Sequence, residues 1–235
     1  MTDVADVVFF DAAGTLFKVK GSVGEVYSRI AGNYGVTAAP AAVEAAFRAA
    51  FHAKSLQGLS PGQNGIRAEK AWWMDIVRQV FASRMSPEVL SEYFEELFAA
   101  FRSARAWTLY DDTRTCLERL RSRGYRLAVI SNFDSRLFDI LANLEIDSFF
   151  EQVVLSWHVA AAKPDPAIFR GALDAMNAAA PRALHVGDSL HEDVAGAIAA
   201  GMPVALLDRD GRHHNWSAGP RLENLHELLK LLRRE

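Results

Sequence analysis

The sequence predicts an α/β protein with a doubly wound parallel sheet and an inserted all-helical cap domain. Short apolar runs alternate with helical patterns along most of the chain, which is the order expected of a parallel sheet. A long helical segment interrupts this order after the first run. With 235 residues, half of them hydrophobic, the chain can bury a core and a modest second module.

Five apolar runs are predicted to be buried strands, because each is short, β-favouring and bounded by polar residues. They are residues 7–10, 127–130, 153–155, 184–186 and 204–207. Apolar residues at three- and four-residue spacing predict the helices of the same domain. These helices are residues 113–123, 135–144, 166–177 and 192–200.

Residues 22–105 break the alternation, because their pattern is helical throughout. The predicted helices of this segment are residues 23–34, 41–56, 69–83 and 87–101. We therefore expect a core domain formed by residues 1–17 and 107–235, and a helical cap domain formed by residues 18–106. The connections near residues 18–22 and 103–107 are the predicted hinges of cap closure.

Charge and composition limit the classes of partner. The chain has 26 basic and 29 acidic side chains, so its net charge of −3 does not favour nucleic acid or an anionic membrane. The acidic first residues do not resemble a secretory signal, and no apolar run has membrane-spanning length. We expect a cytoplasmic protein with a small-molecule substrate, as a monomer or homodimer. Cys116 is the only cysteine, which excludes an internal disulfide.

Three of the predicted strands end in polar residues, namely Asp11, Ser131 with Asn132, and Asp188. Ligands of open α/β sheets bind at the carboxyl ends of the strands, so the active site is predicted at this edge. An isolated Asp-x-x-Gly, such as the one that starts at Asp11, is more often a simple turn. The other strand ends make a chemical role the better interpretation.

Phosphoryl transfer through an aspartyl intermediate needs a carboxylate nucleophile, a cation and donors that hold the phosphoryl group. The carboxylates of Asp188 and Asp193 are oxygen ligands of the kind that a hard cation prefers. Ser131 and Asn132 are neutral hydrogen-bond donors, and Lys163 supplies a fixed positive charge. The sequence therefore contains each of the required groups.

The four motifs occur in a fixed order: DAAGTL from Asp11, SN from Ser131, KP from Lys163 and GDSLHED from Gly187. In this combination the chain resembles the haloacid dehalogenase (HAD) superfamily over essentially its whole length. The helical insertion resembles the C1-type cap of subfamily I. The resemblance implies a HAD-like hydrolase, in the first place a Mg²⁺-dependent phosphatase that acts on a small phosphate ester through an aspartyl-phosphate.

The resemblance also implies roles for the matching residues. Asp11 would be the nucleophile. The phosphoryl group would be bound by Ser131, Asn132 and Lys163. Mg²⁺ would be held by Asp11, the main-chain carbonyl of Ala13, and Asp188. Supporting roles would fall to Thr15, Ser189 and Asp193.

One position departs from the pattern of the family phosphatases. They carry a second aspartate two residues after the nucleophile, where it protonates the leaving group and later activates water, whereas this chain has Ala13. General acid–base assistance is typically worth about 10² to 10⁴ in rate. Its loss indicates activated substrates, a proton from another group such as His158 or His191, or a slow enzyme.

Ala13 also keeps other functions open. Phosphonoacetaldehyde hydrolases carry alanine at this position and form a Schiff base with a cap lysine, for which Lys54 is the candidate. A phosphate-binding regulatory protein without turnover is a further alternative. Haloacid dehalogenases have tyrosine there and lack the metal motif, which argues against dehalogenation. In the cap, the candidate substrate residues are His52, Lys54 and Trp72.

Overall fold

A computed structural model describes residues 5–54, 65–159 and 161–232. The described residues form two compact units. The first, which we call the core unit, comprises those within Met1–Lys18, Leu109–Asp134 and Glu145–Glu235. The second, the helical unit, comprises those within Val19–Thr108 and Ser135–Leu144.

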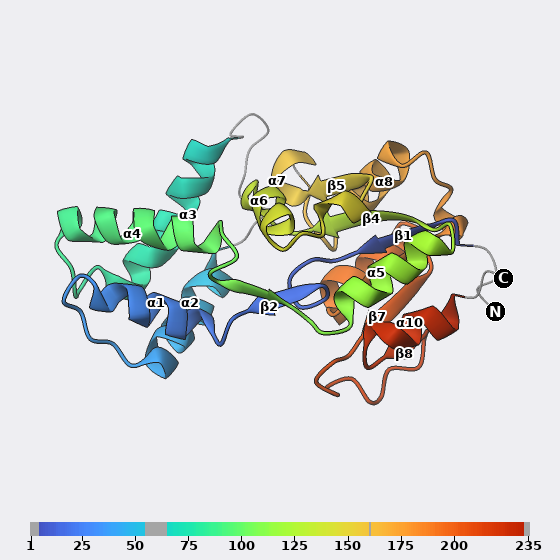
Figure 1. The fold of residues 1–235 in the computed structure, drawn as a ribbon. Helices are drawn as coiled ribbons and strands as arrows, with labels where there is room; N and C mark the ends of the chain where they lie inside the picture. The colour runs from blue at the N-terminus through green and yellow to red at the C-terminus, as the bar shows by residue number, and fades with distance from the viewer. Residues whose placement is uncertain (1–4, 55–64, 160, 233–235) are drawn as a thin grey trace. The chain divides into compact units, whose positions relative to one another are not determined.

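The core unit contains a six-stranded sheet with the order β5-β4-β1-β6-β7-β8, in which all neighbouring strands are parallel (Figure 1). The strands are β1 (Val7–Phe10), β4 (Arg126–Ser131), β5 (Gln152–Leu155), β6 (Ala183–Gly187), β7 (Val204–Leu207) and β8 (Arg221–Leu222). The predicted fold class and the five predicted strands are confirmed. The sixth strand, β8, has only two residues and therefore shows no apolar run in the sequence.

The central strand β1 is buried on both faces, which explains its unbroken apolar sequence. On one face Phe9 belongs to a core cluster with Phe169 and other side chains of α8. Each large apolar side chain in such a cluster contributes about 1.5–3 kcal/mol by burial. The helices of this unit are α5 (Thr113–Ser122), α7 (Ser156–Val159), α8 (Pro166–Ala175), α9 (Gly196–Ala199) and α10 (Leu225–Leu231). Two short 3₁₀ turns, η2 (Asp147–Phe149) and η3 (Ala180–Arg182), complete it.

The segment predicted as one helix over residues 192–200 begins differently. It starts with a π-helical turn, η4 (Leu190–Ala195), which α9 continues. Ser189 precedes the turn, and its hydroxyl accepts a hydrogen bond of 3.1 Å from the Glu192 amide. A π turn brings the residues after β6 into a wider coil than an α-helix does, and such turns are frequent at functional sites.

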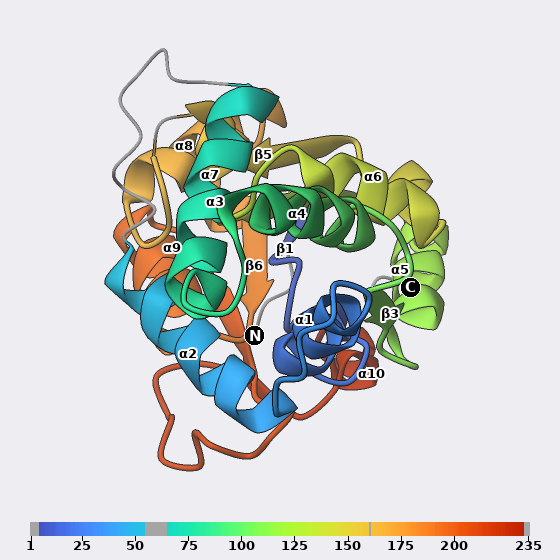
Figure 2. The ribbon, with the colours of Figure 1, turned by 90° about the vertical axis from the view of Figure 1, so that its left-hand side faces the viewer.

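The helical unit is built from α1 (Val23–Gly32), α2 (Pro40–Ala53), α3 (Ile66–Phe81) and α4 (Pro87–Phe101), which Figure 2 shows from another side. Ser22 and Glu25 form a capping box at the start of α1, and Pro40 and Pro87 occupy the first positions of α2 and α4. Residues 55 and 56, the end of the second predicted cap helix, lie outside the described residues. No helix in the described part of the chain is long and apolar enough to cross a membrane.

The helix α6 (Arg136–Asn143) packs with the helical unit, although its position in the sequence predicts a core helix. The Arg136 guanidinium lies 4.5 Å from the ring centres of both Trp73 and Phe98. The Glu69 carboxylate accepts hydrogen bonds from the amide and hydroxyl of Ser135, the residue before α6. These contacts join residues far apart in sequence, which periodicity alone cannot reveal.

Two further strands, β2 (Phe17–Val19) and β3 (Trp107–Leu109), pair with each other where the chain passes between the two units. The Lys20 amide donates to the Ala106 carbonyl over 2.8 Å and extends the pairing. Both passages of the chain are therefore held together. These segments overlap the predicted hinges, and hinge motion stays a prediction.

Candidate active site

Asp11 follows β1 directly and begins a tight loop at the carboxyl edge of the sheet. Its amide donates to the Val186 carbonyl over 2.9 Å, so its backbone is held by the neighbouring strand. Gly14 adopts a φ of +97°, which favours glycine. A Cβ at Gly14 would lie 2.5 Å from Oδ2 of Asp188, so only glycine leaves room for this carboxylate. The loop therefore brings the ends of β1 and β6 into close contact.

The ammonium of Lys163 lies between two carboxylates. Its Nζ is 2.6 Å from Oδ1 of Asp11 and 2.6 Å from Oδ1 of Asp193, and all three side chains are buried. Burial disfavours the charged lysine, but the charges and hydrogen bonds of the two carboxylates outweigh it and raise the pKa of Lys163 above its ordinary value. Lys163 is therefore a permanent cation beside Asp11.

The two carboxylates respond differently to burial. Burial raises the pKa of Asp11 by more than the neighbouring ammonium of Lys163 lowers it, and the negative Asp193 raises it further. Burial also opposes ionisation of Asp193, but Lys163 and His185 outweigh it and hold the pKa of Asp193 well below its ordinary value. Asp193 is therefore ionised at neutral pH and partners Lys163 throughout.

Besides Lys163, two groups fix the orientation of Asp193. Nε2 of His185 lies 2.9 Å from its Oδ1, and the Ser189 amide donates to its Oδ2 over 3.0 Å. A Cβ at Gly187 would lie 2.2 Å from Cγ of Asp193, so glycine is required there for the close approach. His185 is fully buried within β6 and was missed by sequence reasoning. A polar residue inside an apolar run was the signal that could have found it.

Ser131 ends β4 and Asn132 follows it, and the two side chains have different partners. The Ser131 hydroxyl donates to Oδ1 of Asp11 over 3.3 Å. Asn132 instead pairs with the backbone of Lys163, because its Nδ2 donates to the carbonyl over 2.9 Å and its Oδ1 accepts from the amide over 2.7 Å. The amide side chain of Asn132 thus fixes the position of Lys163. Its predicted contact with phosphate stays a prediction.

Glu192 is a further acidic residue of this cluster that sequence reasoning did not single out. Burial raises the pKa of its carboxyl, while Lys163 opposes the shift, as does a hydrogen bond from Asn132. Asn132 therefore contacts both the Lys163 backbone and Glu192. The signal in the sequence was an acid next to Asp193, which an exposed helix start would also show.

Carboxylate oxygens of Asp11, Asp188 and Asp193 all lie within 4.8 Å of one another. Desolvation, followed by the charges of Asp11 and Asp193, raises the pKa of Asp188 to about 7. The Lys163 ammonium contacts Asp11 and Asp193 but not Asp188, so acidic groups outnumber the cation in this cluster. Carboxylate oxygens with uncompensated charge suit a hard divalent cation. Both Asp193 oxygens already accept hydrogen bonds, so Asp11 and Asp188 fit as the direct ligands.

The remaining predicted residues of the core unit support the loop at Asp11. Thr15 is buried, and its carbonyl accepts a hydrogen bond of 2.9 Å from Arg209, which also forms a bidentate pair with Asp112. The Ala13 carbonyl accepts no hydrogen bond from any described residue, and it therefore fits as a metal ligand. Ser189 contributes its amide to Asp193 and its hydroxyl to the start of η4.

The candidate cap residues lie in the helical unit. Nζ of Lys54 forms an ion pair of 2.6 Å with Asp75 and lies 5.5 Å from the ring centre of Trp72. Trp72 is buried and packs edge-on against Phe51 and Trp73. His52 is exposed near the end of α2. Packing between cap helices therefore accounts for Trp72, and an ion pair accounts for Lys54.

Comparison with known proteins agrees with this geometry. The family model of the haloacid dehalogenase-like hydrolases matches residues 5–201. A mouse protein, haloacid dehalogenase-like hydrolase domain-containing protein 3, is 36% identical over 200 residues, which cover 84% of this chain and 80% of the mouse protein.

Solved structures share the fold. A dehalogenase crystallised as an intermediate complex superimposes with a TM-score of 0.77 at 22% identity, and the match covers 100% of both chains. A HAD phosphatase from Thermococcus onnurineus gives a TM-score of 0.66 at 24% identity, covering 96% of this chain and 97% of the phosphatase. Together with the family model and the mouse relative, these matches show that the chain is a hydrolase of the haloacid dehalogenase-like family.

Proposed function

We propose that this hydrolase releases phosphate from a small phosphate monoester in a reaction that requires Mg²⁺. The observation that carries the proposal is the position of the Lys163 ammonium, which lies 2.6 Å from Oδ1 of Asp11. The Ser131 hydroxyl donates a hydrogen bond to the same oxygen. A nucleophilic carboxylate beside a permanent cation is suited to attack on a dianionic phosphate, because the cation offsets the repulsion between two negative groups.

The residues of the core unit account for both half-reactions. A carboxylate oxygen of Asp11 forms a bond to phosphorus while the bond from phosphorus to the leaving oxygen breaks, and the ester oxygen leaves as an anion that takes its proton from water. Water then attacks the aspartyl-phosphate and returns Asp11 and inorganic phosphate. Lys163 offsets the negative charge of the phosphoryl oxygens in both steps, and Asp193 with His185 keeps the ammonium in place.

Asp11, Asp188 and the Ala13 carbonyl would hold Mg²⁺, which supplies additional positive charge for the phosphoryl group. The fit rests on the clustered carboxylate oxygens and on the room that Gly14 leaves for Asp188. The solved phosphatase of the same fold is consistent with this chemistry.

Ala13 determines which esters are good substrates. No carboxyl group stands at this position to protonate the leaving oxygen, so an ester whose leaving group is already a weak base needs less help. We therefore infer a preference for activated esters, such as aryl or enol phosphates, over simple alkyl phosphates.

The structure favours this function over cleavage of a carbon–phosphorus bond through a Schiff base. A Schiff-base lysine must lose its proton before it attacks an aldehyde. Lys54 instead forms an ion pair of 2.6 Å with Asp75, so its nitrogen already has a partner within the helical unit. Borohydride trapping of a labelled aldehyde on Lys54 would revive the alternative.

The test is release of phosphate from p-nitrophenyl phosphate with Mg²⁺ and with a chelator. We expect turnover that needs Mg²⁺, is lost in Asp11→Asn and is kept in Asp174→Asn, which removes an exposed carboxylate of α8. Turnover that survives Asp11→Asn would overturn the mechanism. Binding of phosphate without any turnover would favour a regulatory protein. Activity that appears only in Ala13→Asp would show that the natural protein lacks the acid/base carboxylate at this position.

A further inference from the structure

The helical unit contains a basic hollow whose lining residues are all different from those of the carboxylate cluster. Its volume is about 560 Å³, and its lining residues are Lys20, Glu25, Val26, Arg29 and Arg105. Cavities of about 300–1,000 Å³ are typical of sites for small molecules. The lining comes from three segments: the end of the β2 connection, helix α1, and the turn that precedes β3. We call it the basic hollow.

The three cations of the basic hollow are not neutralised within the protein. Among the described residues, the side chains of Lys20, Arg29 and Arg105 form no ion pair and no hydrogen bond. Other cations of the same unit do have acidic partners, as Lys54 has Asp75 and Arg102 has Asp139. Three unpaired cations around one cavity repel each other, so an anion would stabilise the arrangement.

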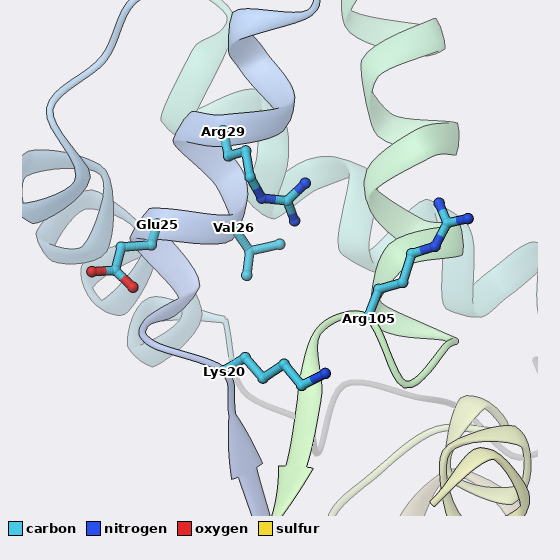
Figure 3. A pocket seen from close by; sticks show the side chains of 5 residues that line it. All are labelled: Lys20, Glu25, Val26, Arg29 and Arg105. Atoms are coloured by element: carbon cyan, nitrogen blue, oxygen red, sulfur yellow. The ribbon is translucent and has the colours of Figure 1, made fainter.

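Glu25, the acidic residue of the lining, already has a hydrogen-bond partner outside the hollow. An oxygen of Glu25 accepts a hydrogen bond of 3.0 Å from the Ser22 amide, as part of the capping box of α1. Figure 3 shows this carboxylate pointing away from the other lining residues, whereas Arg29 points toward the side on which Arg105 lies and Lys20 lies below. Arg105 lines the opposite side, with its guanidinium directed upward, and Val26 adds an apolar side chain between Arg29 and Lys20.

A second hollow of about 340 Å³ shares Arg29 and Arg105 with the basic hollow. Its other lining residues are mostly apolar, including Ile30, Ala99 and Ala100. An apolar group can therefore lie beside the cations. Glu96, the acid of this second hollow, accepts a hydrogen bond of 2.9 Å from Asn33.

We propose that the basic hollow is a second, non-catalytic site for a small phosphorylated molecule, whose phosphate group contacts Lys20, Arg29 and Arg105 while its apolar part occupies the adjoining hollow. Guanidinium groups match phosphate oxygens in paired hydrogen bonds, and three cations suit a dianion better than a single carboxylate. The net charge of −3 disfavours a polyanion such as nucleic acid as the occupant.

Binding would also connect the two passages of the chain between the units. Lys20 follows β2 and Arg105 precedes β3, and the Lys20 amide donates to the Ala106 carbonyl. A phosphate that bridges the two side chains holds this pair of segments together. The exchange of the Lys20 amide hydrogen should therefore slow when the site is occupied.

The test is nuclear magnetic resonance of the arginine Nε–H groups in the full chain, titrated with phenylphosphonate, a phosphate mimic that a phosphatase cannot hydrolyse. The signals of Arg29 and Arg105 should shift and saturate, while that of the exposed Arg84 should not. The readout is local, so it succeeds or fails independently of activity at Asp11. Benzoate, a monoanion of similar shape, should bind at least about tenfold more weakly.

Two double variants that lose the same amount of charge distinguish binding at the basic hollow from a general attraction of anions to the protein. Arg29→Ala with Arg105→Ala should weaken binding at least about tenfold and abolish the slower exchange of the Lys20 amide, because each removes a charge-assisted contact. Arg67→Ala with Arg84→Ala removes two exposed arginines of the same unit and should leave both readouts unchanged. Shifts that do not saturate at tens of millimolar, equal effects of the two variants, or tighter binding of a DNA duplex would each overturn the proposal.

Discussion

Nε2 of His185 lies 2.9 Å from Oδ1 of Asp193, the same oxygen that contacts the ammonium of Lys163. Asp193 is ionised, because its pKa is held well below its ordinary value, so Nε2 of His185 donates this hydrogen bond. Nδ1 of the same ring is buried without a hydrogen-bond partner among the described residues. His185 thus orients the carboxylate that holds the lysine.

Replacing His185 by leucine should lower the free energy of unfolding by about 1–3 kcal/mol, because Asp193 loses a buried donor. Urea unfolding at neutral pH measures the change. The matched control is His185→Gln, which keeps a donor of similar reach and should recover part of the loss. Equal stability of the leucine variant and the natural protein would show that the contact contributes nothing.

Removing the ammonium of Lys163 should lower the free energy of unfolding by more than removing the imidazole of His185. Lys163→Met leaves Asp11 and Asp193 buried without their shared partner, a change that typically costs about 3–5 kcal/mol. The stability that Lys163 gives through Asp193, whose folded pKa is lowered, is present at neutral pH and is lost as the pH falls toward that pKa.

The difference in unfolding free energy between Lys163→Met and the natural protein should therefore shrink as the pH is lowered from neutral. The orphaned carboxylates of the variant can then take up protons, whereas Asp193 of the natural protein resists protonation. Urea unfolding at several pH values measures this trend. A difference that is constant or grows toward acid would contradict the assignment of the charges.

Magnesium binding should depend on pH through Asp188. The pKa of Asp188 is raised to about 7 in the metal-free protein, so a proton competes with the metal below that pH. We expect the affinity to fall by up to about tenfold for each pH unit below about 7 and to be nearly constant above it. Calorimetric titration across this range tests the sign, and Asp188→Asn should bind weakly at every pH.

Gly14→Ala should impair Mg²⁺ binding and turnover together. The new Cβ would lie 2.5 Å from Oδ2 of Asp188, and the φ of +97° adds backbone strain. Gly35→Ala is the matched control, because its φ of +73° imposes strain while no atom lies within 4 Å of the added Cβ. The control should lose about 1 kcal/mol of stability and keep its metal affinity. Equal loss of affinity in both variants would show that strain, not the clash, is responsible.

The sheet could be predicted from the sequence because parallel strands buried on both faces appear as uninterrupted apolar runs, as at residues 7–10. Asp11 was a candidate because it follows such a run, whereas the roles of Lys163 and Asp193 came from the resemblance to a family. The contacts between these three side chains could not be predicted from the sequence. Residues 152 positions apart, such as Asp11 and Lys163, are brought together only by the fold.

Other features had no local signal. The π turn at η4 depends on contacts around Asp193, which compete with the α-helical pattern of the same residues. The packing of α6 with the helical unit depends on Arg136 and Glu69, and both residue types are usually exposed in a sequence-based prediction. His185 was hidden because one polar residue in an apolar run resembles a tolerated exception.

Among the described residues, the hydrogen-bond partners that orient Lys163 are Asp11, Asn132 and Asp193, and all three belong to the core unit. The reacting carboxylate and its cation therefore do not depend on the helical unit for their geometry. Mutations in α1 to α4 can accumulate without disturbing that arrangement. Substitutions in the helical unit could therefore change substrate preference during evolution, while the reactive residues of the core unit were conserved.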